Sequence, residues 1–188
     1  SSNDDVVSVS VSGDQLTMTP VLDFFGDVTI TVTVTDDGGL NDGTSFDLTV
    51  NPVNDAPVMD SISSQTTDEE VSKTITLSSS DVDSGSGVGD ENVPTYTAES
   101  SSPVDVAVIM DGDQLTMTPS LHYNGNVTIT VIATDDGGLS GDTDFVLTVN
   151  PVNDSPVMAS ISSQTTDEEV SKTIMLSSSD VDAGSGVG

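Results

Sequence analysis

The residues of this chain that could do chemistry are acidic side chains gathered in short clusters. These clusters are Asp68-Glu69-Glu70, Asp81-Val82-Asp83, Asp135-Asp136 and Asn153-Asp154, with Asn54-Asp55 and Asp180-Val181-Asp182 as equivalents. A hard cation such as Ca²⁺ takes about six to eight oxygen ligands from carboxylates, amides and backbone carbonyls. An Asp-x-Asp loop offers two carboxylates, and an Asn-Asp pair offers an amide oxygen and a carboxylate. The clusters therefore predict calcium sites; the competing interpretation is an acidic surface that only keeps the protein soluble.

The clusters recur because the sequence repeats. Three segments return 99 residues later, namely 15–20 as 114–119, 36–40 as 135–139 and 52–55 as 151–154. Residues 54–89 and 153–188 differ at only four positions. A period of this length suits one complete domain. Such similar copies favour a structural array over an enzyme.

The Pro-Val-Asn-Asp segments are the expected domain boundaries. They divide the chain into 1–55, the C-terminal part of one domain, 56–154, a complete domain, and 155–188, the N-terminal part of a third. Partial domains leave unpaired strand edges. One explanation is that a longer protein was trimmed. The alternative is that the tail of one chain completes the head of the next by strand complementation.

A strand is expected over residues 126–134, where apolar residues alternate with Thr. Val127, Ile129, Val131 and Ala133 share one face, and the same pattern occurs at residues 27–35. This is typical of a half-buried strand rich in β-branched residues. The other strands expected in the complete domain are 57–66, 71–78, 93–98, 104–110, 113–118 and 145–149. Seven short strands without an amphipathic helix predict an antiparallel β-sandwich. Residues 84–92 could equally be disordered linker.

Composition excludes several classes of function. The chain carries two Lys, no Arg and 32 acidic residues, for a formal charge of -30. No basic patch can meet phosphates, so nucleic acid is excluded as a partner and anionic membranes are disfavoured. No Cys is present, which rules out disulfides and Cys-based zinc sites. No apolar run reaches the ~18 residues of a membrane span, so we expect no membrane insertion.

Other chemistry is less well supported. The loop starting at Asp81 has its Gly at the fifth position instead of the sixth, which argues against an EF-hand. The only His, His122, has Asp23 as its counterpart, so the repeats share no Ser-His-Asp triad. We expect His122 to be a surface turn residue. Lys73 and Lys172 are expected to form exposed ion pairs, with an isopeptide crosslink as the alternative. No catalytic residue is predicted.

The motifs together resemble the cadherin-like repeats of bacterial surface proteins. Residues 34–40 and 133–139 look like the cadherin Ala-x-Asp-x-Gly turn, and residues 51–57 look like the Asp-x-Asn-Asp-x-Ala-Pro linker. Residues 79–85 look like the Asp-x-Asp loop. The resemblance covers the whole chain. It implies an all-β fold of tandem seven-stranded Greek-key β-sandwich domains, cadherin- or immunoglobulin-like, with short linkers.

The resemblance also implies Ca²⁺ at each domain junction. At the first junction the implied ligands are Asn54, Asp55, Asp81, Asp83 and Asp135. At the second they are Glu69, Glu70, Asn153, Asp154, Asp180 and Asp182, with Glu69 favoured over Glu70 by alignment. Asp36 would belong to an earlier junction. Where the family has Leu-Asp-x-Glu, the chain has residues 22–25 and 121–124, which lack the Glu. Asp23 could partly replace it, but His122 stands there in the next copy.

The function expected from these features is a calcium-rigidified spacer of a large secreted or cell-surface bacterial adhesin or matrix protein, of the kind found in biofilms. The first alternative is a subunit of an extracellular fibre or sheath joined end to end, and the second is a carbohydrate-binding module. The expected partners are neighbouring repeats of the same chain. Identical chains joined end to end and surface glycans are the alternative partners.

Overall fold

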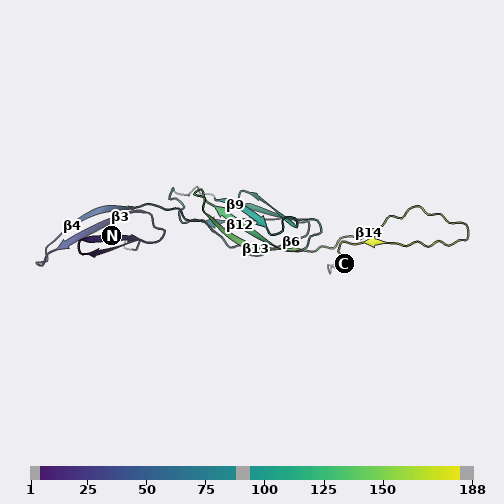
Figure 1. Ribbon diagram of the computed structural model, residues 1–188, viewed down its shortest axis with the longest axis horizontal. Helices are drawn as coiled ribbons and strands as arrows, with labels where there is room; N and C mark the ends of the chain where they lie inside the picture. Colours follow the sequence, from purple (N-terminus) through teal and green to yellow (C-terminus); the bar gives the residue numbers. More distant parts are fainter. Residues whose placement is uncertain (1–4, 88–93, 183–188) are drawn as a thin grey trace. The chain divides into compact units, whose positions relative to one another are not determined.

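The computed structural model describes residues 5–87 and 94–182. All regular elements in these two ranges are strands, and no helix occurs among them (Figure 1). The chain divides into two compact units. One comprises Ser1–Asp60, Ser78–Tyr96 and Ile132–Asp142, and the other Ser61–Leu77, Thr97–Val131 and Thr143–Gly188.

The strands follow the chain in this order: β1 (Val7–Ser12), β2 (Gln15–Pro20), β3 (Gly26–Thr35), β4 (Asn41–Val50), β5 (Val58–Met59), β6 (Gln65–Asp68), β7 (Lys73–Thr76), β8 (Ser79–Ser80), β9 (Thr95–Ser100), β10 (Val106–Asp111), β11 (Gln114–Pro119), β12 (Gly125–Thr134), β13 (Ser140–Asn150), β14 (Val157–Met158) and β15 (Ser178–Ser179).

Seven strands of the second repeat form two sheets. One has the order β10-β11-β7 and the other β6-β13-β12-β9. Each buries an apolar face: Leu115 and Met117 of β11, and Ile129 of β12 and Leu147 of β13, are all 0% exposed. The seven-stranded all-β sandwich expected from the sequence is therefore confirmed. The two-residue strands β5 and β8 form a separate antiparallel pair.

The sequence predicted an antiparallel sandwich, but one strand pair is parallel. β6 runs parallel to β13, with Gln65 opposite Leu147 and Asp68 opposite Asn150. Parallel neighbours need a long connection, and most of the domain lies between these two strands. The backbone amide of Glu69 continues the pairing by donating to the carbonyl oxygen of Asn150 at 2.9 Å. Because of this pairing, the end of β6 and the acidic residues after it lie beside the linker that follows β13.

The expected strands occur with shifted ends. The segment 57–66 is not one strand, because β5 and β6 are separated by residues 60–64. The segment 71–78 shortens to β7, and 104–110 and 113–118 appear as β10 and β11. The strand expected at 93–98 appears as β9, and its expected first residue, Val93, lies outside the described residues. Of the Ser- and Gly-rich segment 84–92, residues 84–87 form turns, and 88–92 lie outside the described residues.

The first repeat copy shows the same hairpins with a smaller core. β1 pairs with β2, and β3 pairs with β4. Val7, Val28 and Ile30 are buried there, but Val34 is 69% exposed, whereas its equivalent Ala133 is 0% exposed. The alternating pattern is the same in the two copies, so the sequence alone does not reveal this difference. The difference arises because the sheet of β3 has two strands and that of β12 has four.

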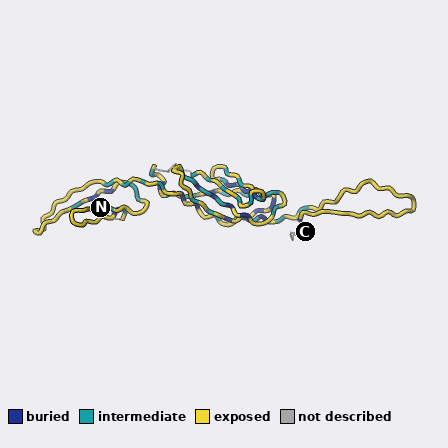
Figure 2. Tube along the Cα trace, viewed as in Figure 1, coloured by how far each residue is buried: buried dark blue, intermediate teal, exposed yellow. Residues whose placement is uncertain are grey.

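Residues 54–82 and their copy, residues 153–181, have nearly identical sequences but adopt different structures. Residues 65–68 and 73–76 form β6 and β7, because β13 and β11 lie beside them. The matching residues 159–177 contain no strand and are exposed throughout (Figure 2). Leu77 is 4% exposed, whereas its copy Leu176 is 63% exposed. Strand formation in this segment therefore depends on partner strands more than on local sequence.

Candidate functional site

The predicted ligands of the first cluster come from three loops of one compact unit. Asn54 and Asp55 follow β4, Asp81 and Asp83 follow β8, and Asp135 follows β12. Each loop begins where a strand ends, and hydrogen bonds join the linker to the other two loops. The structure joins the five predicted residues in two groups of hydrogen bonds, Asn54 with Asp135 and Asp55 with Asp83 and Asp81.

Two hydrogen bonds join the linker to the loops, and a third lies within the loop after β8. The backbone amide of Asp55 donates to Oδ2 of Asp83 at 2.5 Å, and the amide of Asp83 donates to Oδ1 of Asp81 at 2.9 Å. The side-chain Nδ2 of Asn54 donates to Oδ2 of Asp135 at 2.9 Å. Asp83 is only 3% exposed, and its carboxylate accepts the Asp55 amide. Burying a carboxylate is costly unless hydrogen bonds or an opposite charge compensate for the lost water.

Asn54 supplies the observation that points most directly to a cation. Its Oδ1 is buried and has no hydrogen-bond partner among residues 5–87 and 94–182. The amide orientation follows from the network, because a carboxylate such as Asp135 accepts only and so must face Nδ2. Buried polar atoms without a partner are rare, and each calls for an explanation. An amide oxygen is a ligand that Ca²⁺ accepts, so the donor set fits this ion.

Gly137 makes room for Asn54. A Cβ atom at Gly137 would lie 2.5 Å from Nδ2 and 2.9 Å from Oδ1 of Asn54. Any larger residue would therefore displace this side chain. The Asp-Asp-Gly-Gly turn thus contributes both a ligand candidate, Asp135, and the space in which the linker amide packs against it.

The negative charges of the first cluster repel one another. Partial removal of water, followed by the negative charges of Asp23, Asp83 and Asp81, raises the pKa of the Asp55 carboxyl above its ordinary value. Asp23, in the turn after β2, thus adds to the negative potential at Asp55. The arrangement concentrates negative potential that a bound cation would neutralise.

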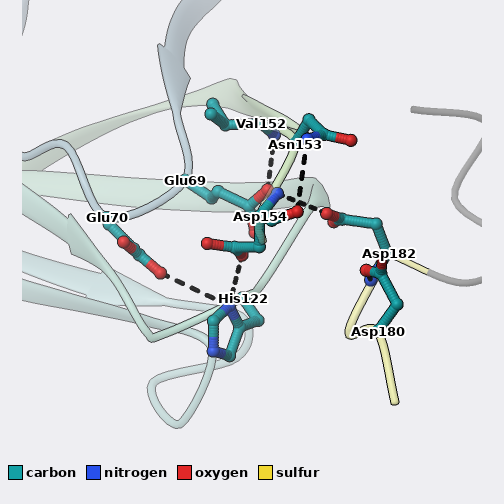
Figure 3. Close-up of polar contacts among 8 residues, drawn as sticks. All are labelled: Glu69, Glu70, His122, Val152, Asn153, Asp154, Asp180 and Asp182. Carbon is teal, nitrogen blue, oxygen red and sulfur yellow. Dashed lines mark hydrogen bonds and ion pairs between the residues drawn. The ribbon is translucent and has the colours of Figure 1, made fainter. Parts of the chain in front are cut away.

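The second cluster repeats the bonds between the linker Asp and the Asp-x-Asp loop, but not the bond of the linker Asn (Figure 3). The amide of Asp154 donates to Oδ2 of Asp182 at 2.5 Å, and the amide of Asp182 donates to Oδ1 of Asp180 at 3.0 Å. Nδ2 of Asn153 donates to the carbonyl oxygen of Asp154 at 3.2 Å. Asp182 is 6% exposed, which matches the burial of its equivalent Asp83.

Glu69 joins the second cluster from the loop after β6. Its Oε1 accepts a hydrogen bond from the amide of Val152 at 2.5 Å, and the residue is 4% exposed. Its position follows from the parallel β6–β13 pair, which puts the end of β6 beside the linker. The sequence preference for Glu69 over Glu70 agrees with this burial, since Glu70 is exposed.

Glu70 and His122 form a contact that the sequence did not predict. Nδ1 of His122 lies 2.8 Å from Oδ2 of Asp154 and 3.4 Å from Oε1 of Glu70. His122 does lie in an exposed turn, as expected, but its ring faces two carboxylates (Figure 3). The only signal in the sequence was the alignment of His122 with Asp23.

Asp36 shows a different use of the same motif. Its Oδ1 accepts the amide of Leu40 at 2.8 Å, and its backbone amide donates to the carbonyl oxygen of Leu40 at 2.9 Å. Asp135 makes the equivalent bond to Leu139 at 2.8 Å. The first Asp of the turn therefore closes the turn in both copies. In Asp135 the second carboxylate oxygen, Oδ2, also reaches the linker.

Comparison with known proteins identifies the fold family. A family model described as a bacterial Ig domain matches residues 54–148, just over half of the chain. The chain belongs to this family. No curated protein sequence matches the chain. The bacterial Ig domain here is therefore placed by its family model and by its structure.

Solved structures of similar shape include cadherin ectodomains. Human CDH23 EC21–23 has 17% identity and a TM-score of 0.56, with 95% of this chain and 62% of that chain covered. Protocadherin gamma B2 extracellular cadherin domains 3–6 have 16% identity and a TM-score of 0.53, with 95% and 45% covered. The chain spans less than two thirds of either structure. This likeness supports a cadherin-like β-sandwich fold, as the sequence suggested. Among the described residues, no helix is long and apolar enough to cross a membrane.

Proposed function

We propose that this bacterial Ig domain chain is a calcium-rigidified spacer of a large secreted or cell-surface adhesin or matrix protein. Its domains would be 1–55, 56–154 and 155–188, joined at the two Pro-Val-Asn-Asp linkers. Its role is structural and not enzymatic. The observation that carries the proposal is the unpartnered, buried Oδ1 of Asn54 among the carboxylates of the first linker.

The proposed mechanism is electrostatic. Two like charges about 4 Å apart repel by on the order of 1–4 kcal/mol at dielectric constants between those of water and a protein surface. Without an ion, this repulsion loosens the contacts between linker and loops. Ca²⁺ replaces it with attraction and fixes Asn54 and Asp55 against the Asp81–Asp83 loop and Asp135. A series of such linkers would turn a flexible string of domains into a stiff one.

The expected affinity suits an extracellular role. Extracellular calcium modules bind with dissociation constants of roughly 10⁻⁴–10⁻³ M. Such sites fill outside the cell and stay empty in the cytosol. The chain could therefore be exported in a flexible form and stiffen outside. The formal charge of -30 would favour the same behaviour, because it opposes compaction until cations bind.

Two measurements test the proposal. Calorimetry should detect Ca²⁺ binding with millimolar or tighter affinity. Small-angle scattering should then show a narrower range of molecular dimensions with Ca²⁺ than with a chelator. A chain carrying Asp81→Ala, Asp83→Ala, Asp180→Ala and Asp182→Ala is the control, and it should respond little to Ca²⁺. Identical scattering of the unmodified chain in both conditions would contradict the proposal.

A second function, an end-to-end fibre subunit, is favoured by residues 159–177. This exposed segment repeats the sequence that forms β6 and β7 in the complete repeat. It could add to the sheet of another copy by strand complementation. Sedimentation and electron microscopy at increasing concentration would show polymers in that case. A chain that stays monomeric supports the spacer instead.

A further inference from the structure

Three metal-ligating side chains meet beside the second linker. Glu70, His122 and Asp154 each offer one ligand atom, and these atoms all lie within 4.8 Å of one another. They come from three separate segments: the loop after β6, the turn after β11 and the linker after β13 (Figure 3). The convergence is therefore a product of the fold and not of neighbouring positions in the chain.

The chemistry of this group differs from that of the calcium clusters because it contains an imidazole. Ca²⁺ takes oxygen ligands. Imidazole nitrogen suits Zn²⁺ and its first-row neighbours, which also accept carboxylate oxygen. The ring nitrogen Nδ1 of His122 faces both carboxylates, at 2.8 and 3.4 Å. This is the nitrogen through which His122 would bind an ion held by the other two residues.

The spacing of the donor atoms fits a small tetrahedral ion. With zinc–nitrogen and zinc–oxygen bonds of about 2.0–2.2 Å, two ligand atoms of a tetrahedron lie about 3.4 Å apart. The observed separations from Nδ1 are 2.8 and 3.4 Å, so the atoms would need only a small shift to hold the ion. The side chains of the three residues are 35–43% exposed, which leaves water access to the remaining coordination position.

We propose that Glu70, His122 and Asp154 form a binding site for a divalent transition ion of the zinc class. The proposal assigns Asp154 two separate roles. Its carboxylate faces His122, whereas its backbone amide is bonded to Asp182 of the calcium cluster. Glu70 and Asp154 are also among the calcium ligands that the resemblance implies at this linker, so the two sites are separated through Asp180 and Asp182, which only the calcium site uses.

The first repeat copy provides an internal comparison. Asp23 occupies the place of His122, and the two have the same left-handed backbone, with φ of 59° and 58°. The same turn thus presents oxygen at the first linker and nitrogen at the second. The two linkers would therefore differ in the class of ion they prefer.

The test uses the fact that His122 is the only His in the chain. Its two ring nitrogens give a single set of imidazole signals in ¹⁵N NMR. Zn²⁺ is titrated into the chain with saturating Ca²⁺ present. We expect a saturable change at Nδ1, while Ca²⁺ alone leaves the ring signals close to their starting positions. Unchanged ring signals at excess Zn²⁺ would overturn the proposal and leave the contact as an ion pair only.

Matched variants separate this site from general binding to acidic residues. His122→Asp installs the residue of the first copy, which tolerates the same φ, and Glu70→Gln removes one carboxylate. Removing an outer-shell partner of a metal commonly costs about 10–100-fold in affinity, so each variant should weaken Zn²⁺ binding at least about tenfold. Calorimetric binding of Zn²⁺ that is equal in the unmodified and His122→Asp chains contradicts the site.

The calcium sites are monitored in the same samples. Asp180→Ala with Asp182→Ala should reduce Ca²⁺ binding and preserve the zinc response of His122. If Ca²⁺ binds as proposed and Zn²⁺ does not affect the ring, only the zinc site is wrong. If Zn²⁺ shifts the ring in a His122- and Glu70-dependent manner but Ca²⁺ does not bind, the spacer proposal is wrong and the zinc site stands.

Discussion

The backbone amide of Asp55 donates a hydrogen bond of 2.5 Å to Oδ2 of Asp83, a residue 28 positions further along the chain. The bond ties the linker to the loop after β8. Asp154 and Asp182 repeat it at the same separation one period later. Part of each cluster is thus ordered by the protein itself, so an arriving cation need not supply all of that order.

Replacing both carboxylates of one loop should affect one linker only. Asp81→Ala with Asp83→Ala removes two predicted ligands and the acceptor for the Asp55 amide. We expect the first linker to lose Ca²⁺ affinity by at least about tenfold, since even outer-shell partners are worth about that much. The second linker should bind as before. Calorimetry would resolve the two sites.

The control for this change is the equivalent pair, Asp180→Ala with Asp182→Ala. It should weaken the second linker and spare the first. Equal losses at both linkers from either pair would mean that the ligand assignment is wrong.

Gly137→Ala should weaken calcium binding at the first linker without removing any ligand. The new Cβ would lie 2.5 Å from Nδ2 of Asn54 and would push that side chain away from Asp135. Gly38→Ala is the matched control, because the nearest atom there is Oδ1 of Asp36 at 3.3 Å. Titration of both variants with Ca²⁺ checks this. If Gly137→Ala binds like the unmodified chain, Asn54 is not a ligand.

Leu77→Ala and Leu176→Ala test how far environment decides the role of a repeated residue. Leu77 is 4% exposed, so its truncation should lower the free energy of unfolding by about 2–5 kcal/mol. Leu176 is 63% exposed, and its truncation should change that free energy by less than about 0.5 kcal/mol. Urea unfolding followed by circular dichroism measures both. Similar losses would show that residues 159–177 pack in solution.

The effect of Asp55→Asn on the melting temperature should depend on whether Ca²⁺ is present. In a chelator the substitution removes one of several facing negative charges, so the melting temperature should rise. With Ca²⁺ present it removes a ligand, so calcium should stabilise the variant less than the unmodified chain. Asp154→Asn is the comparison, because Asp154 faces His122 and its replacement should bring no such gain in chelator. Thermal unfolding in chelator and in Ca²⁺ measures both effects. The same change of melting temperature in the two conditions would contradict the prediction.

The sequence predicted the core of the complete repeat well. The alternation of apolar residues and Thr placed Val127 and Ile129 on one face, and both are buried. In a half-buried strand the residue types alternate with period two, so the buried face can be identified locally. The linker and loop acids could be grouped for a related reason, since they follow strand ends that the pattern had located.

What the sequence could not predict depends on distant parts of the chain. The copies of β6 and β7 within 159–177 have almost the same residues but form no strand, because pairing needs β13 and β11 beside them. The contact of His122 with Glu70 joins residues 52 positions apart, and no local pattern records it. The unpartnered Oδ1 of Asn54 likewise appears only once the loops are assembled.

The unequal surroundings of the two copies have a consequence for proteases. The chain has no Arg, so its two Lys are the only points at which trypsin can cut. Lys73 lies within β7, opposite Met117, whereas Lys172 lies in an exposed segment that contains no strand. Proteases nick exposed loops first. Brief digestion should therefore cleave after Lys172 and spare Lys73. Trypsin would thus distinguish which of two nearly identical segments is paired with partner strands.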